Sequence, residues 1–305
     1  MVSTVQDKTI YWHLPGFCYF FYLNQAVIHM MHEYPDKFNE GYKIGSVYGT
    51  FPGAIWNGGR AVFGIYSKSD MEKVIETYNK YDIPVRFTWT NSLIEEKHLN
   101  DTYCNLIMEL ADNGKNQVLV NTDVLEHYLR EKYPNFEYIS STTKRLLNID
   151  DIKKELDKGY YLVVLDYDLN HNETVLDELK PVADRIEILA DEICFPGCPK
   201  RKDHYKDESL RQLTFDKGAP YPCPNRMTIP SFAECRKRPA FISHEEIADY
   251  ADKGFINFKL VGRGLPQDMV KESYLYYLVK EGFRDEISAK IDEALLKMTG
   301  RKTGR

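Results

Sequence analysis

Eight short runs of β-forming residues alternate with helical patterns along this chain, and this rhythm predicts a TIM-type (β/α)₈ barrel. Repeated βα units build a parallel sheet, because each strand needs a crossover to start again at the same end. Gly114, Gly159 and Gly254 each follow a helical pattern and precede a strand, as expected of the residue that ends a helix. Such regular joints favour one barrel over two separate domains.

The predicted strands lie at 8–14, 42–49, 85–91, 117–122, 136–142, 160–166, 186–193 and 255–262. The predicted helices lie near 22–38, 69–81, 98–113, 123–132, 150–158, 173–182, 244–252 and 268–298. Ser67, Asn148 and Ser243 stand before three of these helices and are residue types that cap helix N-termini. The sequence therefore predicts a single barrel domain over 1–298 and a basic tail over 299–305.

Composition excludes several classes of protein. Hydrophobic residues make up 43% and charged residues 28% of the 305, which indicates a globular chain. The net charge of −6 gives no broad basic surface for a nucleic-acid backbone, so a small-molecule substrate is favoured. No run approaches the roughly 18 apolar residues that a membrane span needs, and the first residues do not resemble a signal peptide. We therefore expect a cytoplasmic protein.

The regular rhythm breaks at 194–242, an insertion of almost fifty residues that is rich in Cys, Pro, Lys and Arg. An unpatterned segment of that length inside a compact domain is usually functional or disordered. It holds four of the six cysteines, Cys194, Cys198, Cys223 and Cys235, with the spacing C-x3-C-x24-C-x11-C. Cys194 stands at the predicted end of the seventh strand, so function is the favoured interpretation.

Four thiolates need a cation or cluster to offset their mutual repulsion, and zinc and iron-sulfur clusters both use four-cysteine sites. Structural zinc favours C-x2-C pairs, and neither pair here has that spacing. The irregular spacing favours an iron-sulfur cluster, with zinc and unligated thiols as the alternatives. Cys18 and Cys104 lie in apolar or helical settings and are expected to be buried free thiols.

Two segments carry a resemblance to a known family. The run Ile188–Tyr205 leads through a strand into the first two cysteines, and Gly254–Arg263 ends in a motif similar to K-I-E-G-R. In their order and separation these segments resemble the peptidase U32 family. The family's first cysteine pair is commonly six residues apart, and Val261 stands where its motif has an acidic residue, so the chain is similar to a divergent member.

The resemblance implies a barrel in which the four cysteines hold a 4Fe-4S cluster. Despite the peptidase name, several members of the family are similar to oxygen-independent hydroxylases. These act on tRNA, ribosomal RNA or a quinone precursor, with prephenate as the oxygen source.

Polar residues at the C-terminal ends of barrel strands are the usual source of catalytic groups. Lys259 and Arg263 are the leading pair, because residues four apart on a strand share a face and both can bind a carboxylate or phosphate. A salt bridge from either to Glu192 or Asp166 is the alternative. The further predicted mouth residues are His13, Asn91, Asn121, Ser141, Thr142, Lys144, Asp166, Asp168 and Glu192.

Two of these residues have alternative roles. Glu192 precedes the first cysteine by two residues and is interpreted as an acid/base group or as a hydrogen-bond partner near the cluster. His13 is interpreted as a proton shuttle, a ligand or a hydrogen-bonded mouth histidine. The glycine-rich loop 49–60 matches no nucleotide-binding pattern and is read as a substrate lid with an aromatic tip or as an ordinary tight loop.

These features predict an iron-sulfur enzyme of the peptidase U32 type that hydroxylates a small molecule or a nucleotide without oxygen. Catalysis would rest on Glu192, Lys259, Arg263 and His13. Two other functions remain open at this point. One is a peptidase or hydrolase, although no common protease motif is present. The other is a non-catalytic protein that uses a structural cluster or zinc and pairs with a partner protein of the same family.

Overall fold

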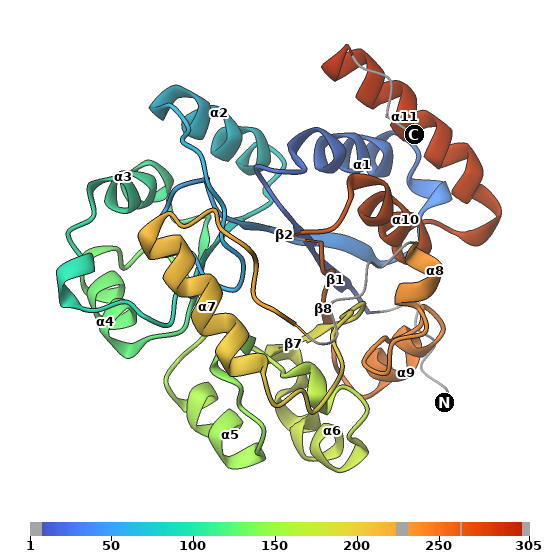
Figure 1. Cartoon of the computed structure of the whole chain (residues 1–305). Helices are drawn as coiled ribbons and strands as arrows, with labels where there is room; N and C mark the ends of the chain where they lie inside the picture. The colour runs from blue at the N-terminus through green and yellow to red at the C-terminus, as the bar shows by residue number, and fades with distance from the viewer. Residues whose placement is uncertain (1–7, 224–230, 263, 301–305) are drawn as a thin grey trace.

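A closed barrel of parallel strands forms the centre of the molecule. The computed structural model describes residues 8–223, 231–262 and 264–300. In this part of the chain, eight strands pair in sequence order from β1 to β8, and β8 closes against β1 (Figure 1). The predicted TIM-type barrel is confirmed. The strands are β1 Ile10–Pro15, β2 Tyr42–Gly49, β3 Val85–Trp89, β4 Gln117–Val120, β5 Glu137–Ser140, β6 Leu162–Val164, β7 Ile186–Leu189 and β8 Asn257–Lys259.

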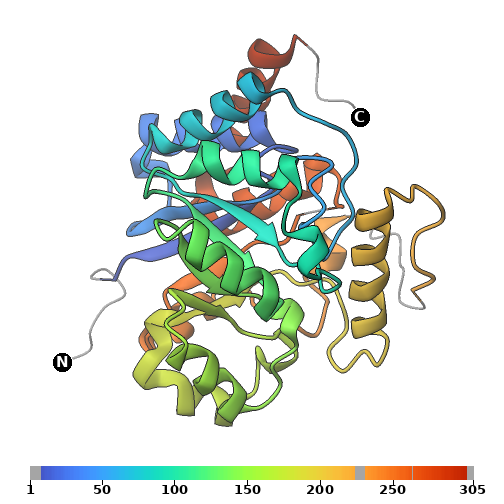
Figure 2. The same cartoon turned by 90° about the vertical axis from the view of Figure 1, so that its left-hand side faces the viewer.

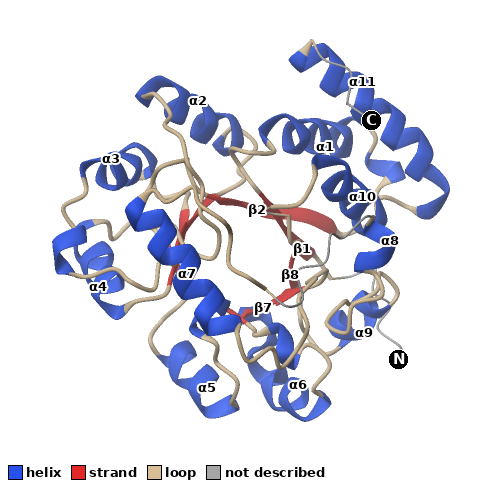
Figure 3. Cartoon of the chain, in the orientation of Figure 1, coloured by secondary structure: helices blue, strands red, loops and turns tan. Residues whose placement is uncertain are grey.

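Helices surround the barrel (Figure 3). They are α1 Phe21–Glu33, α2 Lys68–Asn79, α3 Thr102–Ala111, α4 Asp123–Lys132, α5 Ile149–Asp157, α6 Glu173–Leu179, α7 Arg201–Thr214, α8 Phe232–Cys235, α9 Glu246–Asp252, α10 Gln267–Leu278 and α11 Arg284–Thr299. Ser67 and Asn148 cap α2 and α5 as predicted, since each side chain accepts a hydrogen bond from a backbone N–H of the first turn. The three predicted helix-ending glycines all have positive φ.

The predicted strands are correct in number and order but mostly too long. The predicted run 42–49 matches β2, whereas 186–193 shortens to Ile186–Leu189. The prediction of one long helix over 268–298 is wrong, because the helix is interrupted between α10 and α11. Val279 takes an extended conformation there, and the Lys280 N–H donates a hydrogen bond to the Lys37 carbonyl at 3.0 Å. Pairing with the segment after α1 therefore interrupts the helix.

The sequence suggested that the insertion at 194–242 has no regular pattern, and this is wrong. The insertion contains the fourteen-residue helix α7 and the short helix α8. In the side view, α7 stands at the side of the barrel opposite the N-terminus and lies across its mouth (Figure 2). The helix was missed because its sequence, RKDHYKDESLRQLT, is dominated by charged residues and has only a weak apolar face.

The apolar core lies between the strands and the surrounding helices. Trp12, Trp56 and Trp89 are fully buried in it. The barrel interior is different, because Arg86 of β3 and Glu187 of β7 are each 0% exposed and form an ion pair there. None of the helices in the described part of the chain has the length and apolar character needed to cross a membrane.

Candidate active site at the C-terminal mouth

Helix α7 covers the mouth and is held there by hydrogen bonds to the loops after β2 and β3. The backbone N–H of Ala61 donates to Oε2 of Glu208 at 2.6 Å, and the N–H of Val62 donates to Oε1 of Gln212 at 2.6 Å. Nδ2 of Asn91 also donates to the carbonyl of Ser209 at 3.0 Å. Buried carboxylate and amide groups thus make α7 an integral cover of the barrel.

A small cavity of about 80 Å³ lies at this mouth. Its lining comes from the C-terminal halves of barrel strands, from the loops that follow them and from the first turns of α7. Hydroxyl groups and cations dominate among the polar lining side chains. The lining residues are Tyr48, Gly59, Arg60, Thr88, Thr90, Leu119, Ser141, Thr142, Thr143, Leu189, Glu192, Arg201, Tyr205, Lys259 and Val261.

Among the described residues, three cations and one carboxylate line the cavity. Lys259 is 5% exposed; its Nζ lies 3.3 Å from Oε1 of Glu187, below the cavity, and 4.2 Å from the centre of the Tyr48 ring. Nη2 of Arg201 lies 3.6 Å from Oε2 of Glu192. Its guanidinium also stacks 4.5 Å from the Tyr205 ring. The surplus of positive charge suits an anionic ligand.

Glu192 holds the chain turn that precedes the first cysteine. Its Oε1 accepts hydrogen bonds from the backbone N–H groups of Ile193, at 3.0 Å, and Cys194, at 2.9 Å. The other oxygen faces Arg201. Of the two roles that the sequence suggested, this geometry favours the hydrogen-bonding role, since both oxygens already have protein partners.

Two buried polar groups of the cavity wall lack a hydrogen-bond partner among the described residues. They are Oγ1 of Thr90, whose residue is 3% exposed, and Nε of Arg201, whose residue is 7% exposed. Burying a polar group without a partner costs about 1–3 kcal/mol. An acceptor oxygen on a bound ligand would satisfy both groups, so they indicate a site that is shaped for one.

Three of the four predicted ligand cysteines, Cys194, Cys198 and Cys223, lie in one region of the insertion. Burial raises the pKa of the Cys194 thiol, Arg201 lowers it, and Cys198 is near enough to make a smaller contribution. Cys198 and Cys223 both lie near Tyr221, whose pKa they raise in addition to a larger desolvation effect. All six cysteines are free thiols.

Cys235 is the most enclosed of the four thiols, at 2% exposed. Burial, followed by the charge of Asp191, raises the pKa of Cys235 to about 12. In the part of the chain that the structure describes, no group of three or more His, Cys, Asp or Glu side chains has a metal-holding arrangement. Residues 224–230, between Cys223 and Cys235, lie outside that part. The four-cysteine cluster therefore stays a prediction.

The other predicted mouth residues separate into those that reach the cavity and those that do not. Lys259, Glu192, Ser141 and Thr142 line it. Asn91 binds α7 instead, Asn121 donates to Thr143, and Lys144 pairs with Glu155. Asp166 and Asp168 both pair with Arg145. Arg263 lies outside the described residues, and the salt bridge that Lys259 makes is to Glu187 rather than to Glu192 or Asp166.

His13 is not at the mouth, contrary to the prediction. It stands in the middle of β1 and lines a pocket at the opposite, N-terminal face. Its Nδ1 accepts from Nη2 of Arg86 at 3.1 Å, and its Nε2 lies 3.3 Å from Oδ1 of Asn257. Burial, and then the charge of Arg86, lower the pKa of His13 to about 3, so the ring is neutral.

The loop after β2 is packed rather than free. Trp56 is 0% exposed, its Nε1 donates to the carbonyl of His98 at 2.8 Å, and its ring packs edge-on against Trp89. Of the two interpretations, this packing agrees with an ordinary tight loop rather than with a substrate lid that has an aromatic at its tip. The loop is an anchored wall that supplies Gly59 and Arg60 to the cavity.

Sequence reasoning gave Tyr205 and the basic run around Arg201 only a surface or anion-contact role, and it missed Thr90 in the cavity and Arg86 and Glu187 beneath it. The last two carried a usable signal, because each is a charged residue in the middle of an otherwise apolar strand, VRFTW or IEIL. Two opposite charges at inward positions of two strands indicate a pair inside the barrel. Arg201 gave no such signal, since it stands in a run of charged residues that resembles a solvated surface.

The fold and cavity together define a closed parallel barrel with a cavity at its mouth that is lined mainly by hydroxyl groups and cations. Among solved structures, the chain is similar to one described as "The Structure of the U32 Peptidase Mk0906". The two share 16% sequence identity with a TM-score of 0.51, over 85% of this chain and 94% of the other. The resemblance to the peptidase U32 family is thus confirmed at the level of the fold. No protein-family model and no curated protein sequence matches the chain.

Proposed function

We propose that this protein is an iron-sulfur enzyme of the peptidase U32 type, which acts on a small anionic molecule bound beneath α7. The single observation that carries the substrate class is the cationic cavity at the mouth. The C-terminal end is where barrel enzymes place their chemistry. Lys259 and Arg201 reach this cavity from β8 and α7, and Glu192 is the one carboxylate among its described lining residues.

The described side chains would contact the ligand from different sides of the cavity. Arg201 approaches from the cover, and its planar guanidinium can hold a carboxylate through two parallel hydrogen bonds. Lys259 approaches from the barrel floor, where Glu187 fixes its position. The hydroxyl of Thr90 supplies a further donor. Helix α7 excludes bulk water, which strengthens each of these contacts.

The cluster is the second part of the proposal. Its support is the donor set, namely the free thiols of Cys194, Cys198 and Cys223 in one region and of Cys235 in the same insertion, together with the family resemblance. The described positions do not yet surround one point, so holding a cluster requires the insertion to draw the thiols together. A bound 4Fe-4S cluster would supply electron-transfer or Lewis-acid chemistry beside the cavity, and we derive no reaction step through it.

The reaction that the resemblance suggests is hydroxylation of a small molecule or nucleotide without oxygen, with prephenate as the oxygen donor. Prephenate is a dianion, which agrees with the charge of the cavity, and the cavity of about 80 Å³ would have to widen to admit it. A peptidase activity has only a family name behind it. A non-catalytic role, in which a cluster or zinc holds the insertion in shape for a partner protein, is the remaining outcome.

Anaerobic purification with iron, sulfide and zinc analysis tests the cluster. Iron and sulfide in near-equal amounts, both lost in Cys194→Ser and retained in Cys104→Ser, support the proposal. Cys104 is a matched control, because it is a free thiol buried away from the insertion. A colourless protein that contains one zinc ion would rule out the proposed iron-sulfur enzyme.

Calorimetric titration with prephenate tests the cavity. We expect binding that weakens about tenfold or more in Arg201→Gln, since charge-assisted hydrogen bonds contribute about 1.5–3 kcal/mol. Lys153→Met, an exposed lysine on α5, is the control and should bind as the unmodified protein does. Casein hydrolysis that persists in Cys194→Ser would favour the peptidase instead. A loaded cluster without any prephenate-dependent product would favour the non-catalytic role.

A further inference from the structure

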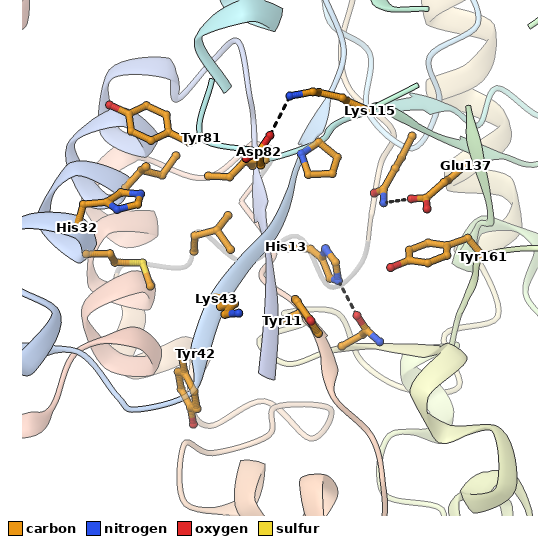
Figure 4. A pocket seen from close by; sticks show the side chains of 18 of the residues that line it. Tyr11, His13, His32, Tyr42, Lys43, Tyr81, Asp82, Lys115, Glu137 and Tyr161 are labelled. Carbon is orange, nitrogen blue, oxygen red and sulfur yellow. Dashed lines mark hydrogen bonds and ion pairs between the residues drawn. The ribbon is translucent and has the colours of Figure 1, made fainter. Parts of the chain in front are cut away.

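A second, larger pocket lies at the N-terminal face of the barrel, on the side opposite α7 (Figure 4). Its volume is about 650 Å³, which is within the range of small-molecule sites. Tyr11, Tyr42, Gln117, Glu137 and Asn257 are the first or second residues of their strands and line it. The pocket therefore enters the barrel from below, while the proposed active site enters it from above.

A buried charged network lies behind the lining of this pocket, which His13, Gln117 and Glu137 connect to it. Arg86 and Glu187 pair there, and each is 0% exposed. Nε of Arg86 donates to Oε1 of Gln117 at 2.9 Å, and Nε2 of Gln117 donates to Oε2 of Glu137 at 2.6 Å. His13 lines the pocket and contacts Arg86. Burying charged groups at such a depth costs desolvation free energy, so packing alone does not explain this face.

The backbone is irregular where it opens toward this network. The pairing of β1 with β2 shifts by one residue, because Trp12 pairs with Ile44 while His13 pairs with Ser46. Gly45 is the extra residue of this bulge and lines the pocket. A Cβ at position 45 would lie 2.7 Å from Cε1 of His13. The glycine therefore keeps the space beside the imidazole open, and bulges of this kind often accompany binding sites.

The walls are aromatic, and one lining lysine of the described chain is left for a ligand. Tyr11, Tyr42, Tyr81 and Tyr161 all line the pocket, and Figure 4 shows Tyr11 and Lys43 near its centre with Tyr161 facing them. The two lining carboxylates already have partners, since Asp82 pairs with Lys115 at 2.8 Å and Glu137 accepts from Gln117. Lys43 has no such partner among the residues that the structure describes.

We propose that this face is a second ligand site, which takes a planar aromatic acid whose ring packs between Tyr11 and Tyr161 while its carboxylate pairs with Lys43. Aromatic rings favour offset or edge-on packing against such walls. The site is independent of the proposed function at the mouth, because it uses the other end of the barrel and none of the cysteines. A ligand here would lie next to His13, which is beside Glu187, and Glu187 in turn pairs with Lys259 of the mouth cavity.

Calorimetric titration with 2-naphthoate tests the site, with cyclohexanecarboxylate and 2-naphthol as probes that lack the aromatic ring or the acid. We expect a dissociation constant for 2-naphthoate below about 1 mM, as its size allows. Binding should weaken about fivefold in Lys43→Met and by a similar factor in Tyr161→Leu, and both comparison probes should bind more weakly. Lys68→Met, an exposed lysine of α2, is the control that should leave binding unchanged.

Hydrogen exchange with 2-naphthoate bound locates the ligand. Protection concentrated on Tyr42–Gly49 and the start of β1 supports the site, and protection of α7 instead assigns the ligand to the mouth and overturns it. Equal affinity for cyclohexanecarboxylate or 2-naphthol overturns the ligand class. Absence of binding at millimolar 2-naphthoate, in a protein whose circular dichroism is that of a folded barrel, overturns the site. None of these results depends on the cluster or on prephenate.

Discussion

The ion pair inside the barrel gives the sharpest prediction about stability. Arg86→Met removes the guanidinium that contacts Glu187, Gln117 and His13, while the methionine keeps most of the side-chain volume. It leaves a carboxylate of 0% exposure with only Lys259, at 3.3 Å, and a neutral His13 beside it. Breaking a buried pair by removing one partner costs about 3–5 kcal/mol, and we expect a loss of that size.

Urea unfolding followed by circular dichroism measures this loss as a change in the free energy of unfolding. A double-mutant cycle with Glu187→Gln separates the pair from its surroundings, and we expect a coupling free energy of at least about 2 kcal/mol. Lys153→Met is the matched control, because its partner Glu178 lies at 3.3 Å and the two side chains are 49% and 46% exposed. An exposed pair contributes about 0–1 kcal/mol.

A loss below about 1 kcal/mol for Arg86→Met, equal to that of the exposed control, would refute this reasoning. The same network predicts a direction with pH. Although burial opposes it, the charges of Arg86 and Lys259 hold the pKa of Glu187 well below its usual range. This contribution is therefore present above the unfolded pKa of about 4.3 and is lost as the pH falls.

Three further predictions concern single sites. Burial raises the pKa of Asp191 to about 7, so its contribution to the free energy of unfolding is complete below about pH 4 and is lost as the pH rises through 7. In urea unfolding at a series of pH values, Asp191→Asn should make the free energy of unfolding nearly constant across that window. The neutral His13 has its pKa lowered to about 3, so stability should fall as the pH drops from about 6.5, and His13→Gln should remove this fall; an unchanged slope contradicts the prediction. A Cβ at Gly58 would lie 2.2 Å from the Thr90 carbonyl oxygen, so Gly58→Ala should cost more than about 2 kcal/mol in thermal unfolding, whereas Gly282→Ala, which meets nothing within 4 Å, should cost little.

Local pattern was enough to predict the fold. The alternation of β-rich runs with helical patterns, and glycines such as Gly114 and Gly159 at the joints, depend on residues close together in the chain. Caps behave in the same way, since Ser67 bonds to a backbone N–H only three residues on. Boundaries were less certain, because the long helix predicted over 268–298 is broken by pairing with residues near Lys37, over two hundred positions away.

By itself, the sequence determined the barrel, the order of its strands and the gathering of four cysteines in one insertion, because these follow from periodicity and composition. Only the tertiary structure decided which side chains meet. It placed Arg201 of α7 over Lys259, joined Arg86 to Glu187 across the barrel, and assigned His13 to the N-terminal face. The physical reason is that strand register and helix docking fix contacts between residues a hundred positions apart, and no local pattern records that register.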